Sequence, residues 1–336
     1  MFFAQSYSLA IIFCIITMLC WGSWANMQKA TGKIEKKWAF QYFYWDYAIG
    51  VLLVSFILAI TLGSHGELGR GFFTDLTQAH FSMIALAFIG GIVFNLANIL
   101  LVAAIDIAGM AVAFPVAIGI ALVLGVILNY IVHPIGSPYF LSVGVVAIAV
   151  AIFLDAKAYK ALGQNISDSQ VQKGLLIALI SGILMGLFYY FVAASMATNI
   201  AHPETGKLTP YSAGFIFALG LFISNFIINT WMMKKPLNGA AVAPSGYFKG
   251  KALTHVFGII AGIIWGLGTG LNFIAAGTAG PAISYGLGQG ATMIAALWGV
   301  LIWREFKSAP KETNKALIAM FIFYIIGLCF LIAAKV

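Results

Sequence analysis

Charged residues are scarce in this chain. Asp, Glu, Lys and Arg together make up 8% of its 336 residues, whereas 62% of the residues are hydrophobic. Because a soluble domain carries about 25% charged residues, this composition excludes an ordinary water-soluble globular protein. Ten-residue segments of alternating polar and apolar side chains, which a membrane β-barrel needs, are missing as well. The composition therefore predicts an all-α integral membrane protein.

Cysteines and catalytic motifs are equally few. Cys14, Cys20 and Cys329 lie inside apolar runs without metal-ligand or redox spacing, so we interpret them as packing or lipid-facing residues. The chain contains no H-E-x-x-H and no G-x-S-x-G sequence, and no pair of aspartates deep in an apolar run. These absences argue against an intramembrane enzyme, and we expect neither a cofactor nor a metal.

The apolar residues gather into ten runs of about the 20 residues that cross a bilayer. The first run has no basic leader and no cleavage site, so we expect it to be a retained helix. The predicted spans are residues 7–27, 39–62, 81–104, 109–131, 138–155, 174–197, 211–233, 253–276, 281–303 and 316–334.

Lys and Arg are distributed unequally between the loops. Fifteen of them, Lys37 included, fall on the side reached after the first span, and only Arg70, Lys207 and Lys335 fall on the other. Because short cytoplasmic loops are enriched in Lys and Arg, we expect an inner or plasma membrane protein with both termini outside. The same distribution gives the net charge of +8 a role in membrane orientation and not in binding nucleic acid.

The two halves of the chain resemble each other. A shift of 171 residues aligns 90–111 with 261–282 without a gap, and matches Gly91 with Gly262 and Gly109 with Gly280. A nearly equal shift aligns 47–57 with 217–227. Five helices cross the membrane an odd number of times, so the second copy must be inverted. We therefore predict two inverted five-helix repeats, residues 1–157 and 174–336, joined by a cytoplasmic connector, 158–173. Secondary transporters of this design bind their solute near the midplane between the repeats.

Polar side chains inside the spans are amides, hydroxyls and aromatic rings. Buried polar groups in lipid usually face a cavity or a partner, and this lining suits a neutral, hydrogen-bonding, ring-shaped solute better than an ion. The candidate solute-binding residues are Trp21, Trp24, Asn26, Tyr42, Asn95, Asn98, Tyr189, Asn225, Trp265, Thr269, Asn272, Tyr285 and Gln289.

Several of these residues have a structural alternative. Trp24 and Tyr189 are equally typical of the aromatic belt at a membrane surface, and Asn95 and Asn98 of hydrogen bonds between helices. Three acidic residues, Asp106, Asp155 and Glu305, lie beside short loops, so we interpret them as interface or ion-pair residues. The five histidines, among them His255, lie in loops or at helix ends, where a role in proton transfer is the minority interpretation.

Asp46 is the only charged residue between Lys37 and Glu67. It lies about eight residues into the second span, or about 12 Å deep at 1.5 Å per residue, without a Lys or Arg within one turn. Removal from water disfavours the charged form of a carboxyl group, so we predict that Asp46 takes up and releases a proton during transport. The alternative is a structural acid bonded to a nearby hydroxyl such as that of Tyr42.

Four segments carry a resemblance to a known family: "CWGSWAN" (20–26), "YWDYAIG" (44–50), the long run 90–130 and "GQGATMIAALWGVLIWREFKSAPKETN" (288–314). The chain resembles the drug/metabolite transporter superfamily, and more closely the plant ureide permeases and the related bacterial glucose/ribose porters. The resemblance extends over most of the chain, but the long central cytoplasmic loop of the plant members is absent here. It implies proton-coupled uptake of small neutral compounds, ureides and nucleobases in the plant branch and sugars in the bacterial one.

The repeat, the lining and the resemblance together predict a proton-coupled importer of a sugar, ureide or nucleobase. An exporter of drugs or metabolites from the same superfamily is the alternative. The expected partners are a small neutral polar solute, a proton and the lipid bilayer, without nucleic acid, and the chain is expected to act as a monomer.

Overall fold

In the part of the chain that the structure describes, the protein folds as a bundle of long helices, ten of which are long and apolar enough to cross a membrane. The computed structural model describes residues 1–36, 38–162, 167–307 and 309–335, so Lys37 and residues 163–166 of the predicted connector lie outside the described residues. The helices are α1 (Tyr7–Ser23), α2 (Ala25–Ile34), α3 (Phe40–Ile60), α4 (Phe72–Gln78), α5 (Phe81–Ala108), α6 (Met110–Val132), α7 (Pro138–Lys160), α8 (Asp168–Ser195), α9 (Pro210–Lys234), η1 (Pro244–Lys249), α10 (Ala252–Ala279), α11 (Pro281–Gly288), α12 (Ala291–Leu297), η2 (Trp298–Ile302) and α13 (Lys311–Ala333).

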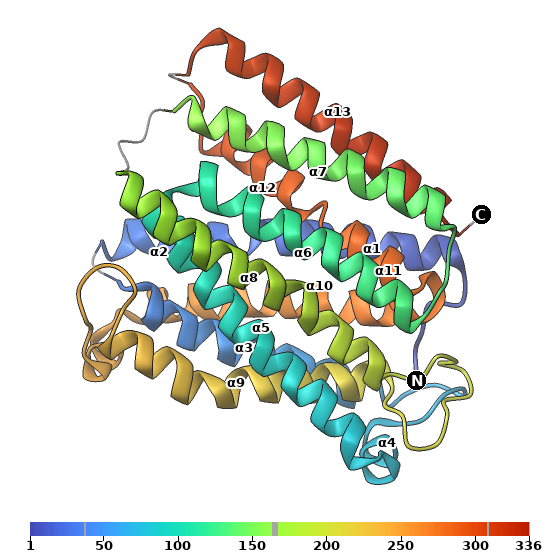
Figure 1. The fold of residues 1–336 in the computed structure, drawn as a ribbon. Helices are drawn as coiled ribbons and strands as arrows, with labels where there is room; N and C mark the ends of the chain where they lie inside the picture. Colours follow the sequence, from blue (N-terminus) through green and yellow to red (C-terminus); the bar gives the residue numbers. More distant parts are fainter. Residues whose placement is uncertain (37, 163–166, 308, 336) are drawn as a thin grey trace.

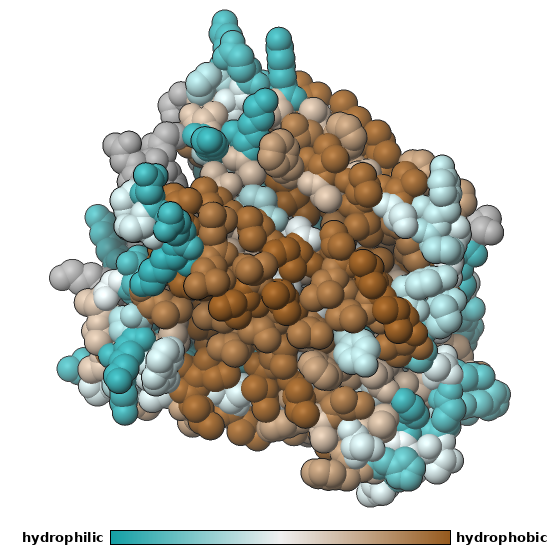
Figure 2. All heavy atoms as spheres, viewed as in Figure 1, coloured by the Kyte–Doolittle hydropathy of each residue, from teal (hydrophilic) through white to brown (hydrophobic). Residues whose placement is uncertain are grey.

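The prediction of an all-α membrane protein with ten spans is confirmed. The spanning helices run along one common direction, and both chain ends lie at the same end of the bundle (Figure 1). An apolar surface covers the middle of the molecule, with polar residues gathered toward its two ends (Figure 2). Large apolar side chains such as Ile131, Phe153 and Ile227 are more than 60% exposed. Such exposure is stable only in lipid.

The two ends of the bundle differ in charge. One end, which we call the lysine-rich end, carries Lys29, Lys33, Lys157, Lys160, Lys234, Lys235, Lys249 and Lys251. The other end, which we call the terminal end, carries both termini, α4 and the loop between α8 and α9 (Figure 1).

Two connections at equivalent places in the halves are a single residue long. Gly109 joins α5 to α6 with a φ of 78°, and Gly280 joins α10 to α11 with a φ of 92°. Only glycine adopts this left-handed region readily. The spans that the sequence ended at residues 104 and 276 therefore continue to Ala108 and Ala279 before the chain reverses.

Close helix crossings occur at glycines that the predicted repeat pairs with each other. In one half α5 meets α9 where Gly91 faces Gly220, and in the other α10 meets α3 where Gly262 faces Gly50. Helices pack this closely in lipid only where small residues let the backbones approach. Likewise α5 packs on α8 while α10 packs on α1. This arrangement is consistent with two inverted repeats.

Candidate functional site

A cavity of about 450 Å³ lies inside the bundle. Residues of α1, α2, α5, α6, α7, α8, α10, α11 and α12 line it, so both predicted repeats contribute to its wall. At its inner end it reaches Trp265, and toward the lysine-rich end it reaches Asp106 and Tyr159. A second hollow of about 300 Å³ shares Gln28 and Asp106 with it and is bordered by the loop after α9. The cavity therefore extends toward the lysine-rich end.

Aromatic rings form the inner end of the cavity. The ring of Trp265 stacks on Phe94 with a centroid distance of 4.3 Å, and on Trp21 at 6.0 Å and an interplanar angle of 12°. Trp21 is fixed further, because its Nε1 donates a hydrogen bond to Thr269 Oγ1 at 3.0 Å. Its ring also lies against Gly288, where a Cβ atom would come within 2.7 Å of it. These contacts hold flat apolar faces in place before any solute arrives.

The rest of the wall is mostly apolar, with side chains such as Leu101, Ile105 and Phe114, and a few polar groups interrupt it. Asn98 of α5 reaches Tyr44, with 3.3 Å between Nδ2 and the hydroxyl oxygen. Gln289 lines the cavity where the regular helix is interrupted between α11 and α12. Interrupted helices expose backbone groups to bound solutes in many transporters. The wall also includes Gln28 and Thr292. Neutral amides and hydroxyls of this kind can both donate and accept hydrogen bonds.

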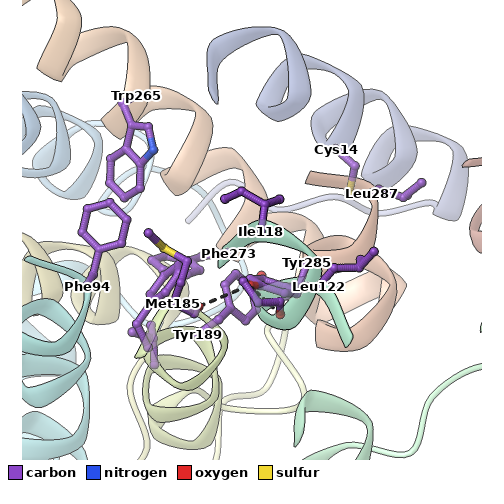
Figure 3. Packing of buried hydrophobic residues seen from close by; sticks show 14 of the residues in the cluster. Cys14, Phe94, Ile118, Leu122, Met185, Tyr189, Trp265, Phe273, Tyr285 and Leu287 are labelled. Atoms are coloured by element: carbon purple, nitrogen blue, oxygen red, sulfur yellow. Dashed lines mark hydrogen bonds between the residues drawn. The ribbon is translucent and has the colours of Figure 1, made fainter. Parts of the chain in front are cut away.

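The cavity is shut off from the terminal end by a buried hydrogen-bond network. The hydroxyl of Tyr189 lies 2.6 Å from Asn272 Oδ1 and 3.0 Å from Ser284 Oγ. Asn272 Nδ2 donates to the backbone oxygen of Ser284 at 2.9 Å. Tyr285 donates to the backbone oxygen of Met185, a residue that lines the cavity. Figure 3 shows Tyr189 and Tyr285 grouped next to Met185, with Trp265 facing Phe94 at the other side of the cluster.

The predicted solute-binding residues fall into three groups. Those that line the cavity are Trp21, Trp24, Asn98, Trp265 and Gln289. Those that border it, in the network toward the terminal end or against Trp21, are Tyr189, Thr269, Asn272 and Tyr285. Those that lie outside the cavity lining are Asn26, Tyr42, Asn95 and Asn225.

Three members of the third group have hydrogen-bond partners nearby, whereas neither side-chain polar atom of buried Asn225 has one among the described residues. Asn26 Oδ1 accepts from Trp303 Nε1, and the hydroxyl of Tyr42 donates to the backbone oxygen of Ala243 at 2.6 Å. Asn95 Nδ2 donates to Ser224 Oγ at 2.8 Å across the contact between α5 and α9. The bond of Asn95 matches its alternative interpretation, a hydrogen bond between helices.

Asp46 is buried between α3, η1 and α10, outside the lining of the cavity. Its Oδ1 accepts from the hydroxyl of Tyr247 at 2.6 Å, and both of its oxygens lie 3.0 Å from His255 Nδ1. Burial, followed by the hydrogen bond to Asp46, raises the pKa of Tyr247, so its hydroxyl keeps the proton that it donates. The hydroxyl that donates to Asp46 is therefore that of Tyr247, whereas the hydroxyl of Tyr42 donates to Ala243.

Some cavity residues were not among the sequence candidates. Gln28, Tyr159 and Asp155 all line it, as does Asp106. Asp155 was placed beside a loop because the apolar run ends there, but α7 continues to Lys160. A helical pattern carried one turn past the apolar run would have placed Asp155 and Tyr159 on one face. In the described residues, no group of three or more His, Cys, Asp or Glu side chains could hold a metal ion.

Comparison with known proteins connects this architecture to a family. A family model described as ureide permease matches residues 43–172 and 160–334. Ureide permease 1 of Arabidopsis thaliana is 25% identical over 395 residues, covering 100% of this chain and 99% of that protein. The glucose uptake protein GlcU of Bacillus subtilis (strain 168) is 27% identical over 252 residues, covering 74% of this chain and 75% of that protein.

The fold also has a counterpart among solved structures. A chain titled only "Crystal structure of protein" superposes with a TM-score of 0.56 at 14% identity, covering 97% of this chain and 96% of that chain. At this identity the likeness concerns the fold alone.

Proposed function

Because this chain belongs to the ureide permease family, we propose that it is a proton-coupled importer that carries a small neutral polar solute, a sugar or a ureide, through the central cavity. Names among its relatives support uptake as the direction, since one is a ureide permease and another a glucose uptake protein. The lysine-rich end is then the cytoplasmic end, with both termini outside, because cytoplasmic loops concentrate Lys and Arg.

The observation that carries the proposal is the composition of the cavity wall. Flat rings from Trp21, Phe94 and Trp265 offer apolar faces, while Asn98 and Gln289 offer neutral hydrogen-bonding groups. A sugar or ureide ring has the complementary surface, an apolar face with polar groups around its edge. The volume of about 450 Å³ lies within the range of about 300–1,000 Å³ that is usual for small-molecule sites.

The described cavity wall also argues against an anionic solute. It contains no Lys or Arg, and two carboxyl groups, those of Asp106 and Asp155, border it. An anion would therefore meet like charges without a counter-ion, which is costly in a partly dry site. A neutral solute meets no such penalty.

Transport by the purified protein tests this function. Proteoliposomes would be given radiolabelled ribose, glucose, allantoin and uracil, with and without an inward proton gradient. We expect saturable uptake of one class, increased by the gradient. If none of the four is taken up beyond the rate of protein-free liposomes, the proposal is wrong.

A substitution in the cavity wall tests whether the solute binds there. Trp265→Leu removes a ring whose stacking contact contributes about 0.5–1.5 kcal/mol, so the KM should rise about 2- to 10-fold. Trp231→Leu is the matched control, because Trp231 is 53% exposed on α9 and outside the cavity. Equal KM values for the two variants would place binding elsewhere.

A further inference from the structure

Asp155 is a buried acid in the cavity wall. It lies five residues before the end of α7 and is 4% exposed. It lines the same cavity as Trp21 of α1 and Trp24, the residue that joins α1 to α2. A proton and a solute bound here would therefore occupy a single cavity.

The Asp155 carboxyl has no partner among the described residues. Its Oδ1 is shut off from solvent and makes no hydrogen bond, and none of the ion pairs in the described part of the chain includes Asp155. Burying an ionised carboxylate without a partner costs several kcal/mol, and such a group takes up a proton instead. Asp46 differs, because His255 and Tyr247 already satisfy it outside the cavity.

The groups around Asp155 leave its carboxylate without a counter-ion of its own. Glu305 and Tyr324 lie within electrostatic reach of it, and Tyr159, one turn further along α7, donates to Glu305 Oε2 at 3.1 Å. Lys29 of α2 pairs with Glu305. Asp106, across the cavity, accepts a hydrogen bond from Asn238 at 2.8 Å. One ammonium group thus faces three carboxyl groups, and a proton on Asp155 removes one of the two negative charges that it cannot balance.

We propose that Asp155 is the proton-binding carboxyl group of the transport cycle. Its carboxylate accepts one proton from the outer solution when the cavity faces outward, and releases it to water at the lysine-rich end when the cavity opens there. The proposal rests on the proposed import function, and it differs from the sequence-based prediction for Asp46, which is its direct rival.

Three variants of the full-length protein separate the two sites in proteoliposomes. Asp155→Asn removes the proton site with little change in shape, Asp46→Asn removes the rival site, and Asp168→Asn is the matched control on an exposed position of α8. Each is measured with labelled glucose and allantoin in two ways: accumulation driven by an inward proton gradient, and exchange of internal for external solute without a gradient.

One pH unit supplies about 1.4 kcal/mol, which supports about tenfold accumulation for one proton per solute. We expect Asp155→Asn to exchange solute but to accumulate none beyond equilibration, whereas Asp46→Asn and Asp168→Asn accumulate it as the wild type does. Wild-type accumulation by Asp155→Asn overturns the proposal, as does loss of accumulation in Asp46→Asn alone. Accumulation driven by a sodium gradient and not by a proton gradient overturns it as well.

An infrared pH titration of the purified protein tests Asp155 without any solute. The wild type should show a carboxylic C=O band that titrates and that Asp155→Asn lacks, while Asp155→Glu should restore a titrating band and proton-driven accumulation. The same titrating band in wild type and Asp155→Asn overturns the proposal. Absence of uptake by the wild type refutes the import function instead, so the two failures are distinguishable.

Discussion

Alanine at a helix crossing tests whether the two halves are built alike. A Cβ atom at Gly91 would lie 2.0 Å from the backbone oxygen of Phe217, and one at Gly262 would lie 2.0 Å from the backbone oxygen of Tyr47. Ordinary contact begins at 3.4 Å, so each substitution requires a backbone displacement of more than 1 Å. Overpacking of this kind costs about 1–3 kcal/mol. We expect similar losses of stability for Gly91→Ala and Gly262→Ala.

The chain provides a matched control in Gly119→Ala. Gly119 lies inside α6, and a Cβ atom there would meet nothing within 4 Å. Alanine is favoured over glycine inside a helix by about 0.5–1 kcal/mol, so this variant should be neutral or slightly stabilised. Tryptophan fluorescence during thermal unfolding in detergent measures all three. If Gly91→Ala and Gly262→Ala unfold at the temperature of Gly119→Ala, the close crossings are not present. Unequal losses at the two crossings would refute their equivalence.

Two further predictions concern buried hydrogen bonds. Tyr189→Phe leaves Asn272 Oδ1 without its hydroxyl donor. We expect the free energy of unfolding to fall by about 1–3 kcal/mol and hydrogen–deuterium exchange at the start of α11 to become faster. Unchanged exchange would show that this network does not close the cavity. His255→Ala removes a partner from buried Asp46 and should lower the free energy of unfolding by about 1–3 kcal/mol. Thermal unfolding measures this loss, with His202→Ala at an exposed position as the control. Equal unfolding midpoints for the two variants would contradict a stabilising contact between His255 and Asp46.

The membrane class and the ten spans follow from composition and run length, because lipid tolerates only long apolar helices whose backbone bonds are made internally. Exact helix ends do not follow from hydropathy. Helix α7 continues past its apolar run, and α5 and α10 continue to Gly109 and Gly280. A helix persists into polar sequence as long as its backbone bonds form and its neighbours pack against it.

Among the candidate site residues, the aromatic and amide side chains of the cavity could be predicted as a class. Trp21 and Trp265 come together from α1 and α10, about 240 residues apart in the chain, and no local pattern encodes their stacking. Nor does a local pattern distinguish the roles of Asn95 and Asn98, which lie on one helix. Asn95 bonds to Ser224 of α9, while Asn98 lines the cavity.

The sequence by itself determined that this chain is a helical membrane protein with ten spans, because hydropathy depends on each segment alone. It also predicted the inverted repeat, with paired glycines that the helix crossings match. Only the tertiary structure decided which polar groups share the cavity. His255 and Tyr247 bond to Asp46 but lie more than 200 residues away from it in the chain, so no local pattern predicts these contacts. Asp155 was interpreted as an interface residue, yet it lines the cavity without a partner in the described chain. The burial of a side chain and its hydrogen-bond partners depend on helices that are distant in the chain, so they are set only when the bundle packs.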